Sequence, residues 1–226
     1  LLHGFPGFEK NLDLAQSIRR AGWNVVFFHY RGSWGSGGDF SFAHVIEDVD
    51  VVIESIVEPS YAAAHRIDPD RIALVGHSMG GFAALIAGAK LGQIDCIASL
   101  AGANMGGLVK AAVQAGGGAE QMAASLDSWS GPIVGPGGAA LVAEVMDGAD
   151  CFDTLLGVPQ LAGKSMLLVA GRLDDVTPIR LHHDPLVEAL EAEGAARLRI
   201  KIFENGDHSF SGQRIALSRT VIDWLE

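Results

Sequence analysis

Residues 76–81 read Gly-His-Ser-Met-Gly-Gly, between an apolar segment of strand length at 71–75 and a helix-forming segment at 82–90. A Gly-x-Ser-x-Gly motif between a strand and a helix is typical of a nucleophile elbow, a sharp turn that exposes a serine hydroxyl. The crowded turn requires small residues at Gly76 and Gly80. It places Ser78 at the N-terminus of the helix, where free N–H groups and the helix dipole favour an anion. A glycine-rich turn without catalytic function is the alternative, since the chain contains 29 glycines.

The composition is that of a compact globular protein. The 226 residues, 49% hydrophobic and 19% charged, suffice for one sizeable core and favour one domain. The formal net charge of −11 argues against nucleic acid or an anionic membrane as a partner, because phosphate binding requires a basic surface. No apolar run of the sequence reaches the roughly 18 residues of a membrane-spanning helix.

Cysteine usage indicates the redox environment. The chain contains two cysteines, Cys96 and Cys151. Because two thiols do not make a disulfide framework, we expect both to be small core residues of a protein in a reducing compartment. The cytoplasm is therefore the expected location.

Strand-forming and helix-forming segments alternate along the chain. This alternation predicts an α/β fold with a doubly wound, mainly parallel sheet and right-handed crossovers. In such a sheet the loops that follow the strands meet at the carboxyl edge, where ligands bind. The predicted strands cover 1–2, 23–29, 71–75, 96–100, 165–170 and 198–203, and the predicted helices cover 11–21, 43–57, 82–90, 186–193 and 214–226.

The alternation stops between residues 103 and 163, a segment rich in Ala and Gly. A segment of this length between two strands usually has a function of its own. We therefore divide the chain into a core, 1–102 and 164–226, and a helical cap insertion at 103–163, with short helices near 108–114 and 141–146 and no independent second domain. Apolar side chains of the cap are candidates for a substrate pocket, although each could simply pack the cap together: Met105, Leu108, Met122, Trp129 and Met146.

A serine nucleophile needs two further groups. A base must lie within hydrogen-bond reach, and an acid must fix the tautomer of that base and stabilise its cation. The pair Asp174 and Asp175 and then His208 follow Ser78 in the sequence, each directly after a predicted strand. His208 is the candidate base. Asp174 is favoured as the acid because the first loop residues are best placed to turn inward, whereas Asp175 is expected to cap a helix or face water.

The other histidines in loops or at strand ends are assigned no catalytic role. His3 is expected to be structural, and His29 to pack or to face solvent. His77 should direct its side chain away from the serine. His182 and His183 follow the acid loop too closely to serve as the base, and adjacent histidines do not share a helix face, so no metal site is expected there.

An oxyanion formed at the serine needs two backbone N–H donors. The N–H of Met79, directly after the nucleophile, is one candidate. The other comes from the loop His-Gly-Phe-Pro-Gly at residues 3–7. Pro6 has no N–H, so Phe5 is the expected donor, and Gly4 allows the backbone to approach closely.

The motifs at residues 3–7, 76–81, 171–178 and 206–210 together resemble those of the α/β-hydrolase superfamily of serine hydrolases, and they span nearly the whole chain. The order serine, acid, histidine is that of the superfamily. Its pattern places the acid three residues after a glycine, at Asp174. The sequence Tyr-Arg-Gly-Ser-Trp-Gly at 30–35 is similar to one in the dienelactone hydrolase and prolyl oligopeptidase-like branch.

This resemblance implies a function as well as a fold. It implies hydrolysis of a small-molecule carboxylic ester through an acyl-enzyme, without a metal or an organic cofactor. Two alternatives stay open. One is peptidase or amidase action by the same residues, as in the prolyl oligopeptidase-like branch. The other is a non-catalytic binding protein, because a fold does not determine a function.

The start of the chain departs from the pattern of this superfamily. The superfamily usually has two more strands before the loop at 3–7, and this sequence lacks them. The predicted strand at 25–28 would then lie at an open apolar edge of the sheet, which is prone to aggregation. We expect upstream residues or a partner chain, such as a second copy in a homo-oligomer, to cover this edge.

Overall fold

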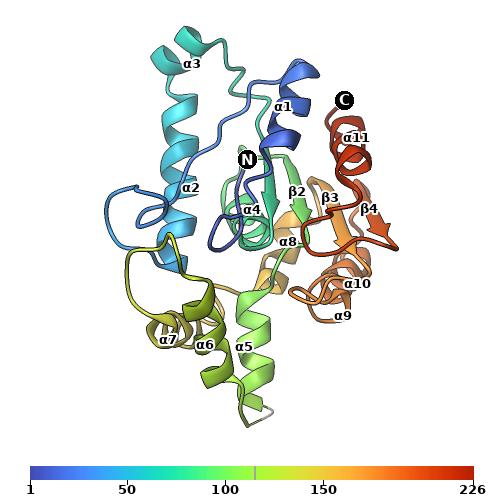
Figure 1. Ribbon diagram of the computed structural model, residues 1–226. Coiled ribbons are helices and arrows are strands. Elements are labelled where there is room, and N and C mark those ends of the chain that lie inside the picture. Colours follow the sequence, from blue (N-terminus) through green and yellow to red (C-terminus); the bar gives the residue numbers. More distant parts are fainter. Residues whose placement is uncertain (115) are drawn as a thin grey trace.

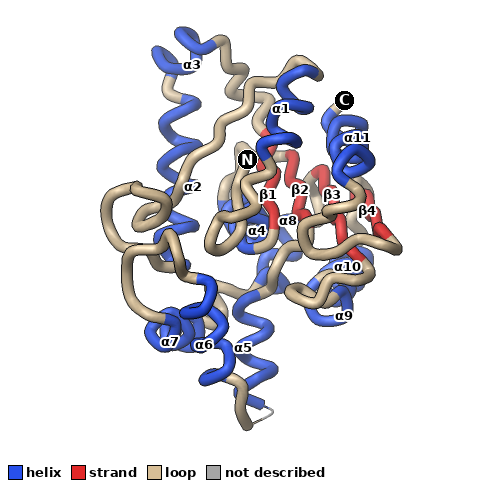
Figure 2. The backbone as a smooth tube through the Cα atoms, in the orientation of Figure 1, coloured by secondary structure: helices blue, strands red, loops and turns tan. Residues whose placement is uncertain are grey.

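Four parallel strands form the centre of the molecule. The computed structural model describes residues 1–114 and 116–226. The strands are β1 (Ala73–His77), β2 (Cys96–Leu100), β3 (Ser165–Gly171) and β4 (Leu198–Phe203), and they lie side by side in sequence order (Figure 2). In the parallel register, Ala73 pairs with Cys96 and Cys96 pairs with Ser165. The carboxyl ends of neighbouring strands therefore lie at the same edge.

Helices cover both faces of this sheet, which confirms the doubly wound α/β prediction. Figure 1 shows α1 beside α11, and the buried side chains fall into two clusters, one on each face. The face with α1 (Leu12–Arg20) and α11 (Arg214–Leu225) lies opposite the face with α2 (Phe42–Val57), α4 (Met79–Lys90), α8 (Val158–Leu161) and α10 (Asp184–Ala192).

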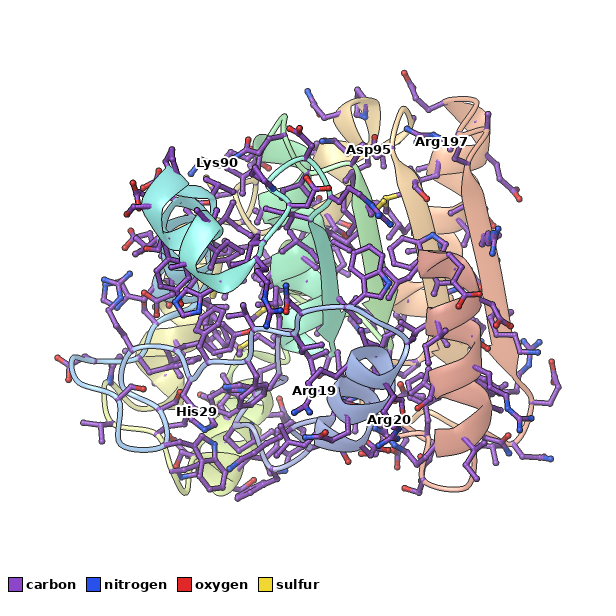
Figure 3. All side chains as sticks on the ribbon, turned by 90° about the horizontal axis from the view of Figure 1, so that it is seen from above. Arg19, Arg20, His29, Lys90, Asp95 and Arg197 are labelled. Atoms are coloured by element: carbon purple, nitrogen blue, oxygen red, sulfur yellow. The ribbon has the colours of Figure 1, made fainter. Side chains whose placement is uncertain are left out.

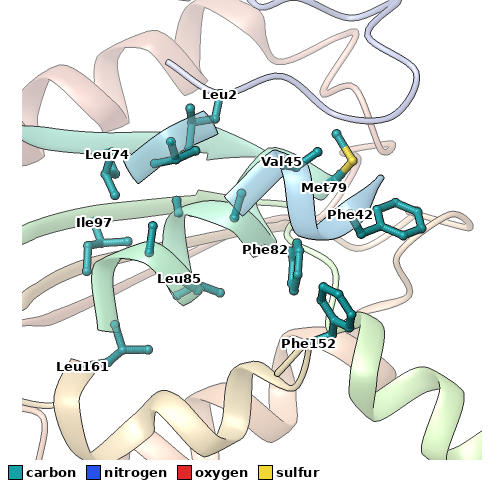
Figure 4. Close-up of a cluster of buried hydrophobic side chains, with 14 of the residues drawn as sticks. Leu2, Phe42, Val45, Leu74, Met79, Phe82, Leu85, Ile97, Phe152 and Leu161 are labelled. Carbon is teal, nitrogen blue, oxygen red and sulfur yellow. The ribbon is translucent and has the colours of Figure 1, made fainter. Parts of the chain in front are cut away.

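Side chains of the strands alternate between the two clusters. Leu74 of β1 and Ile97 of β2 belong to the same cluster as Phe82 of α4 (Figure 4). The next residues, Val75 and Ala98, belong to the cluster on the other face. This period of two places an apolar residue on each face in turn, so the inner strands read as continuous apolar runs.

The turn between β1 and α4 is as crowded as the sequence predicts. A Cβ atom on Gly76 would lie 1.9 Å from the backbone oxygen of Gly80, and one on Gly80 would lie 2.2 Å from that of Leu2. Atoms cannot approach so closely, so any side chain at these positions would push the strand and the helix apart. Glycine is therefore required at both ends of the elbow.

The strand β4 forms one edge of the sheet. Its Arg199 and Lys201 are exposed, and charged side chains on an edge oppose pairing with another strand. Arg197, just before β4, donates two hydrogen bonds to Asp95, just before β2, at 2.7 and 2.9 Å. Figure 3 shows these two labelled residues close together. The bidentate pair links the starts of two strands across β3.

The prediction of a strand at 23–29 is wrong. This segment is extended, but it belongs to no strand of the described structure. In space, Leu1 and Leu2 lie between this segment and β1 and bond to both. The N–H of Leu2 donates to Val75 O at 2.9 Å and Leu2 O accepts from the N–H of His77 at 3.1 Å, while the Leu1 amino group donates to Val26 O at 2.7 Å. Two residues are too few to continue the ladder, so the apolar run lacks a strand to pair with. Cover of this edge by upstream residues or by a partner stays a prediction.

The segment 103–163 contains more helix than the sequence predicts. The predicted helices near 108–114 and 141–146 correspond to α5 (Met105–Gln114) and α7 (Gly138–Asp147), and α6 (Ala119–Trp129) was missed. No residue of α6 is fully buried, and its Met122 and Leu126 pack only partly buried against the core. Figure 1 shows α5, α6 and α7 gathered at one end of the molecule. Shorter helices are α3 (Pro59–His65), the 3-10 turn η1 (Thr154–Gly157) and α9 (Ile179–His182).

The segment 130–135 joins this insertion to the N-terminal loops. Ile133 forms an antiparallel bridge with Ser33. The N–H of Val134 donates to Gly32 O at 2.7 Å, and the N–H of Phe40 donates to Val134 O at 2.8 Å. The insertion is thus held against the loop that contains the Tyr-Arg-Gly-Ser-Trp-Gly motif.

The sequence also led to expectations about the two cysteines and about membrane-spanning helices. Cys96 is half-buried in β2, but Cys151 is exposed in the turn after α7, so its expected core position is wrong. Both thiols are free. In the described parts of the chain, no helix has both the length and the apolar character that crossing a bilayer demands.

Candidate active site

The structure brings Ser78, His208 and Asp174 into one chain of hydrogen bonds. His208 Nε2 lies 3.0 Å from Ser78 Oγ, and His208 Nδ1 lies 2.8 Å from Asp174 Oδ2. Ser78 follows β1, Asp174 follows β3 and His208 follows β4. The shared carboxyl edge of the parallel strands therefore joins residues that are 130 positions apart in the sequence.

Ser78 adopts a backbone conformation that residues other than glycine rarely adopt. Its φ is 58° and its ψ is −120°, at the junction between β1 and α4. The N–H of Ser78 donates to Leu100 O at 2.9 Å, and the N–H of Ala103 donates to Ser78 O at 3.2 Å. Strained backbone of this kind persists where surrounding contacts impose it, and it is concentrated at functional sites.

Asp174 is buried and accepts hydrogen bonds on both carboxylate oxygens. The N–H groups of Val176 and Thr177 donate to Oδ1 at 2.9 and 2.8 Å, and the Thr177 hydroxyl lies 2.7 Å from Oδ2. Burial by itself would raise the pKa of Asp174, but the hydrogen bonds from His208 and Thr177 outweigh it and lower the pKa. Asp174 is therefore an anion beside the imidazole, whereas Asp175 is exposed.

Thr177 and His77 support the site although the sequence analysis gave them no role in it. His77 was expected to direct its side chain away from the serine, and its Nε2 lies 2.8 Å from His208 O, so the ring donates to the loop that carries His208. Burial lowers the pKa of His77 to about 4, which keeps the ring neutral. The Asp-x-x-Thr spacing of the acid loop was a usable signal for Thr177, because Asp side chains often accept N–H groups two or three residues ahead.

The loop at residues 3–7 lies directly against the serine. A Cβ atom on Gly4 would be 2.8 Å from Ser78 Cβ and 3.3 Å from Ser78 Oγ, so only glycine permits this approach. Within residues 1–114 and 116–226, the N–H groups of Phe5 and Met79 have no hydrogen-bond acceptor. Both are therefore free to donate to a ligand at Ser78, as an oxyanion hole would require.

His182 and Asn104 connect this site to the insertion. The N–H of Asn104 donates to His182 Nδ1 at 2.9 Å, and the Asn104 side chain donates to Asp153 Oδ1 at 2.9 Å. Asp153 in turn accepts from Lys110 of α5 at 2.9 Å. Burial lowers the pKa of His182 to about 4. The loop after β2 is thus fixed between the acid loop and the first helix of the insertion.

The five apolar residues proposed for a substrate pocket differ in their exposure. Met105 and Met122 pack partly buried against the core, Leu108 is half-buried, and Trp129 and Met146 are 44% and 42% exposed. A cavity of about 570 Å³ lies between α2 and the segment 23–28, and none of Ser78, Asp174 or His208 lines it. The pocket assignment stays a prediction.

Metal-ligating residues do not cluster in the part of the chain that the structure describes. No three His, Cys, Asp or Glu side chains there are arranged so that they could share an ion. The polar groups around Ser78 instead satisfy one another through the hydrogen bonds given above.

Comparison with known proteins places this geometry in a family. The sequence model of the alpha/beta hydrolase family matches residues 1–217. The chain belongs to the alpha/beta hydrolase family. No curated protein is similar enough in sequence to be matched to it.

Solved structures of this fold include several hydrolases. A monoacylglycerol lipase from Paleococcus ferrophilus is 19% identical over 99% of this chain and 91% of its own, with a TM-score of 0.67. Est1E from Butyrivibrio proteoclasticus, solved with bound ferulic acid, is 17% identical over 99% of this chain and 86% of its own, with a TM-score of 0.76. The Pyrococcus furiosus esterase Pf2001 is 17% identical over 99% and 78%, with a TM-score of 0.68. At these identities the likeness establishes the fold of this family member.

The buried histidines of this hydrolase-family chain predict a loss of stability in mild acid. Burial lowers the pKa of His3, His77 and His182 to about 4 each, whereas an unfolded histidine has a pKa of about 6.5. Between these values the unfolded chain binds protons that the folded chain does not, so the free energy of unfolding falls as the pH falls. The slope approaches about 1.4 kcal/mol per pH unit for each histidine.

Urea unfolding at pH 8, 7, 6 and 5 measures this dependence. We expect a steep decline between pH 6.5 and 4.5, which His77→Gln makes shallower and His65→Gln, an exposed position, does not change. The lowered pKa of Asp174 acts in a separate window, near and below pH 4, because its stabilisation is lost only when the carboxylate is protonated. A constant free energy of unfolding from pH 7 to 5 would contradict the prediction.

Proposed function

We propose that this family member is a serine hydrolase that cleaves carboxylic esters through an acyl-enzyme. The observation that carries the proposal is the continuous hydrogen-bonded chain Ser78–His208–Asp174, with distances of 3.0 and 2.8 Å, beside the free N–H groups of Phe5 and Met79. Nucleophile, base, orienting acid and oxyanion donors are the groups that acyl transfer to a serine requires.

In the first half-reaction, Ser78 Oγ attacks the carbonyl carbon of the ester while His208 Nε2 takes its proton. The carbonyl oxygen becomes an anion that the N–H groups of Phe5 and Met79 stabilise. Asp174 holds the proton on His208 Nδ1 and stabilises the imidazolium. The tetrahedral intermediate then collapses, the bond to the alcohol oxygen breaks, and His208 gives its proton to the departing alcohol.

In the second half-reaction, water replaces the alcohol. His208 Nε2 takes a proton from water as its oxygen attacks the acyl-enzyme, and the same two N–H groups stabilise the second oxyanion. Collapse breaks the bond to Ser78 Oγ, which recovers the proton from His208, and the acid leaves. Two of the similar solved structures are named a lipase and an esterase, which supports an ester as the first substrate class to test.

A substrate panel tests the proposal. We expect the protein to hydrolyse p-nitrophenyl esters, assayed from acetate to octanoate, and to hydrolyse aminoacyl p-nitroanilides more slowly by orders of magnitude. A fluorophosphonate probe should label Ser78, identified by peptide mass spectrometry, and heat-denatured protein should not react. Faster turnover of the anilides would indicate a peptidase or amidase instead. Failure of native protein both to react with the probe and to turn over any ester would indicate a non-catalytic binding protein.

A further inference from the structure

A hydrogen bond from His3 fixes the peptide unit that carries the second oxyanion donor. His3 Nδ1 lies 2.7 Å from Gly4 O. A carbonyl oxygen only accepts, so this ring nitrogen carries the proton. The Gly4–Phe5 peptide bond is trans, so the N–H of Phe5 points opposite to Gly4 O and away from His3. The direction of that N–H is therefore set by the imidazole.

The neighbouring His29 completes the hydrogen-bonding of His3. His29 Nδ1 lies 3.3 Å from His3 Nε2. Because the proton of His3 is on Nδ1, its Nε2 is an acceptor and His29 Nδ1 must be the donor. His3 is 1% exposed, and burial lowers its pKa to about 4, so the ring carries a single proton at neutral pH. His29 thus selects the tautomer in which His3 can hold Gly4 O.

Trp34 holds the same loop two peptide units further along. Its indole Nε1 donates to Pro6 O at 2.8 Å, and its ring is stacked on His29 with centroids 5.8 Å apart. A Cβ atom on Gly7 would lie 2.6 Å from Trp34 Nε1 and 2.8 Å from His3 Nδ1, so the loop is pressed against both rings. Trp34 itself has a φ of 52°, a value that is uncommon for a residue other than glycine.

These contacts form a brace on both sides of Phe5. We propose that His29 and Trp34 are positioning residues for the oxyanion hole, which hold, through His3 and Pro6, the peptide unit that contains the N–H of Phe5 and the peptide unit between Pro6 and Gly7. Neither side chain is assigned a contact with the reacting atoms. The inference rests on the proposed function, because it concerns a donor that acts only on the oxyanion of an acyl-transfer reaction. His29 lies in the N-terminal loop region in Figure 3.

A brace that positions a donor differs in its effects from one that only stabilises the loop. A misplaced N–H stabilises the transition state less, because the transition state carries an oxyanion. The bound ester carries no oxyanion, so its binding is affected less. Loss of positioning therefore lowers kcat with little change in KM. It also weakens the binding of an aryl trifluoromethyl ketone inhibitor, because the adduct of this ketone with a serine carries the same kind of oxyanion. A purely structural effect lowers the unfolding temperature and the amount of active enzyme without changing this affinity.

Two conservative substitutions separate the interactions. His29→Phe keeps a ring against Trp34 but removes the donor to His3, and Trp34→Phe keeps a ring against His29 but removes the donor to Pro6. We expect each to lower kcat/KM for a p-nitrophenyl ester by about 10- to 100-fold, with KM changed less than about twofold and the ketone inhibition constant raised by the same factor as kcat falls.

Matched variants complete the experiment. His29→Asn restores an N–H donor near His3 Nε2, so it should recover most of the activity. Trp224→Phe removes a buried indole N–H that has no acceptor in the described structure, so it should leave the kinetics unchanged. The inference would be overturned if the wild type is active and both His29→Phe and Trp34→Phe bind the ketone with unchanged affinity. Wild type without ester turnover would instead overturn the proposed function.

Discussion

Replacing Ser78 with alanine should lower kcat for p-nitrophenyl esters by about a hundred-thousandfold or more, because the proposed mechanism forms the acyl-enzyme on this hydroxyl. The fold should be unaffected. The side-chain hydroxyl is hydrogen-bonded only to His208 in the described structure, and alanine keeps the Cβ atom and thus the steric demands on the backbone at φ 58°. We expect the free energy of unfolding to change by less than about 1 kcal/mol.

The measurements are ester turnover, fluorophosphonate labelling and urea unfolding on the same preparations. Ser128→Ala, an exposed substitution on α6, is the matched control and should retain turnover and labelling. The double variant Ser78→Ala/His208→Ala should be hardly slower than Ser78→Ala alone, because residues that act as one unit do not contribute additively. Retained turnover in Ser78→Ala would remove Ser78 as the nucleophile, whatever the other variants show.

The sequence predicted that Ser78, Asp174 and His208 lie together, which the structure shows, but it did not predict the edge of the sheet, and the reason is topological. Parallel strands bring the loops at their carboxyl ends together, so residues after β1, β3 and β4 could be assigned to one place without knowing any distance. The elbow could be predicted from local rules, because Gly76 and Gly80 occupy positions where a Cβ atom would collide with backbone. These inferences depend on chain order and sterics, which a sequence contains.

Other features depend on partners that local sequence does not reveal. The segment 23–29 has the composition of a strand, but a strand exists only where another strand can pair with it, and Leu1 and Leu2 provide a single bridge. His77 is the last residue of β1, and its contact with His208 O depends on a loop 131 positions later. The brace formed by His29 and Trp34 likewise depends on how the loop after residue 30 folds back onto residues 3–7. Each involves a long-range contact that the local sequence does not specify.

Substituting Asp174 by asparagine should lower kcat by about a thousandfold to ten-thousandfold, and the geometry indicates why. The N–H groups of Val176 and Thr177 both donate to Oδ1, so the amide oxygen of asparagine must occupy that position. Its NH₂ group then takes the place of Oδ2, which accepts from His208 Nδ1 in the native site. An NH₂ group at that point donates to Nδ1 and forces the ring proton onto Nε2, where it blocks acceptance of the proton from Ser78.

The adjacent aspartate provides the matched comparison. Asp175→Asn makes the same chemical change one residue away on an exposed side chain, so we expect kcat to change less than about twofold. Both variants are assayed at one pH with the same ester, and the pattern of urea unfolding checks that the acid loop is intact. A larger loss in Asp175→Asn than in Asp174→Asn would reassign the acid. Equal, small losses would mean that His208 needs no carboxylate to hold its tautomer, which the hydrogen bond of 2.8 Å to Asp174 Oδ2 argues against.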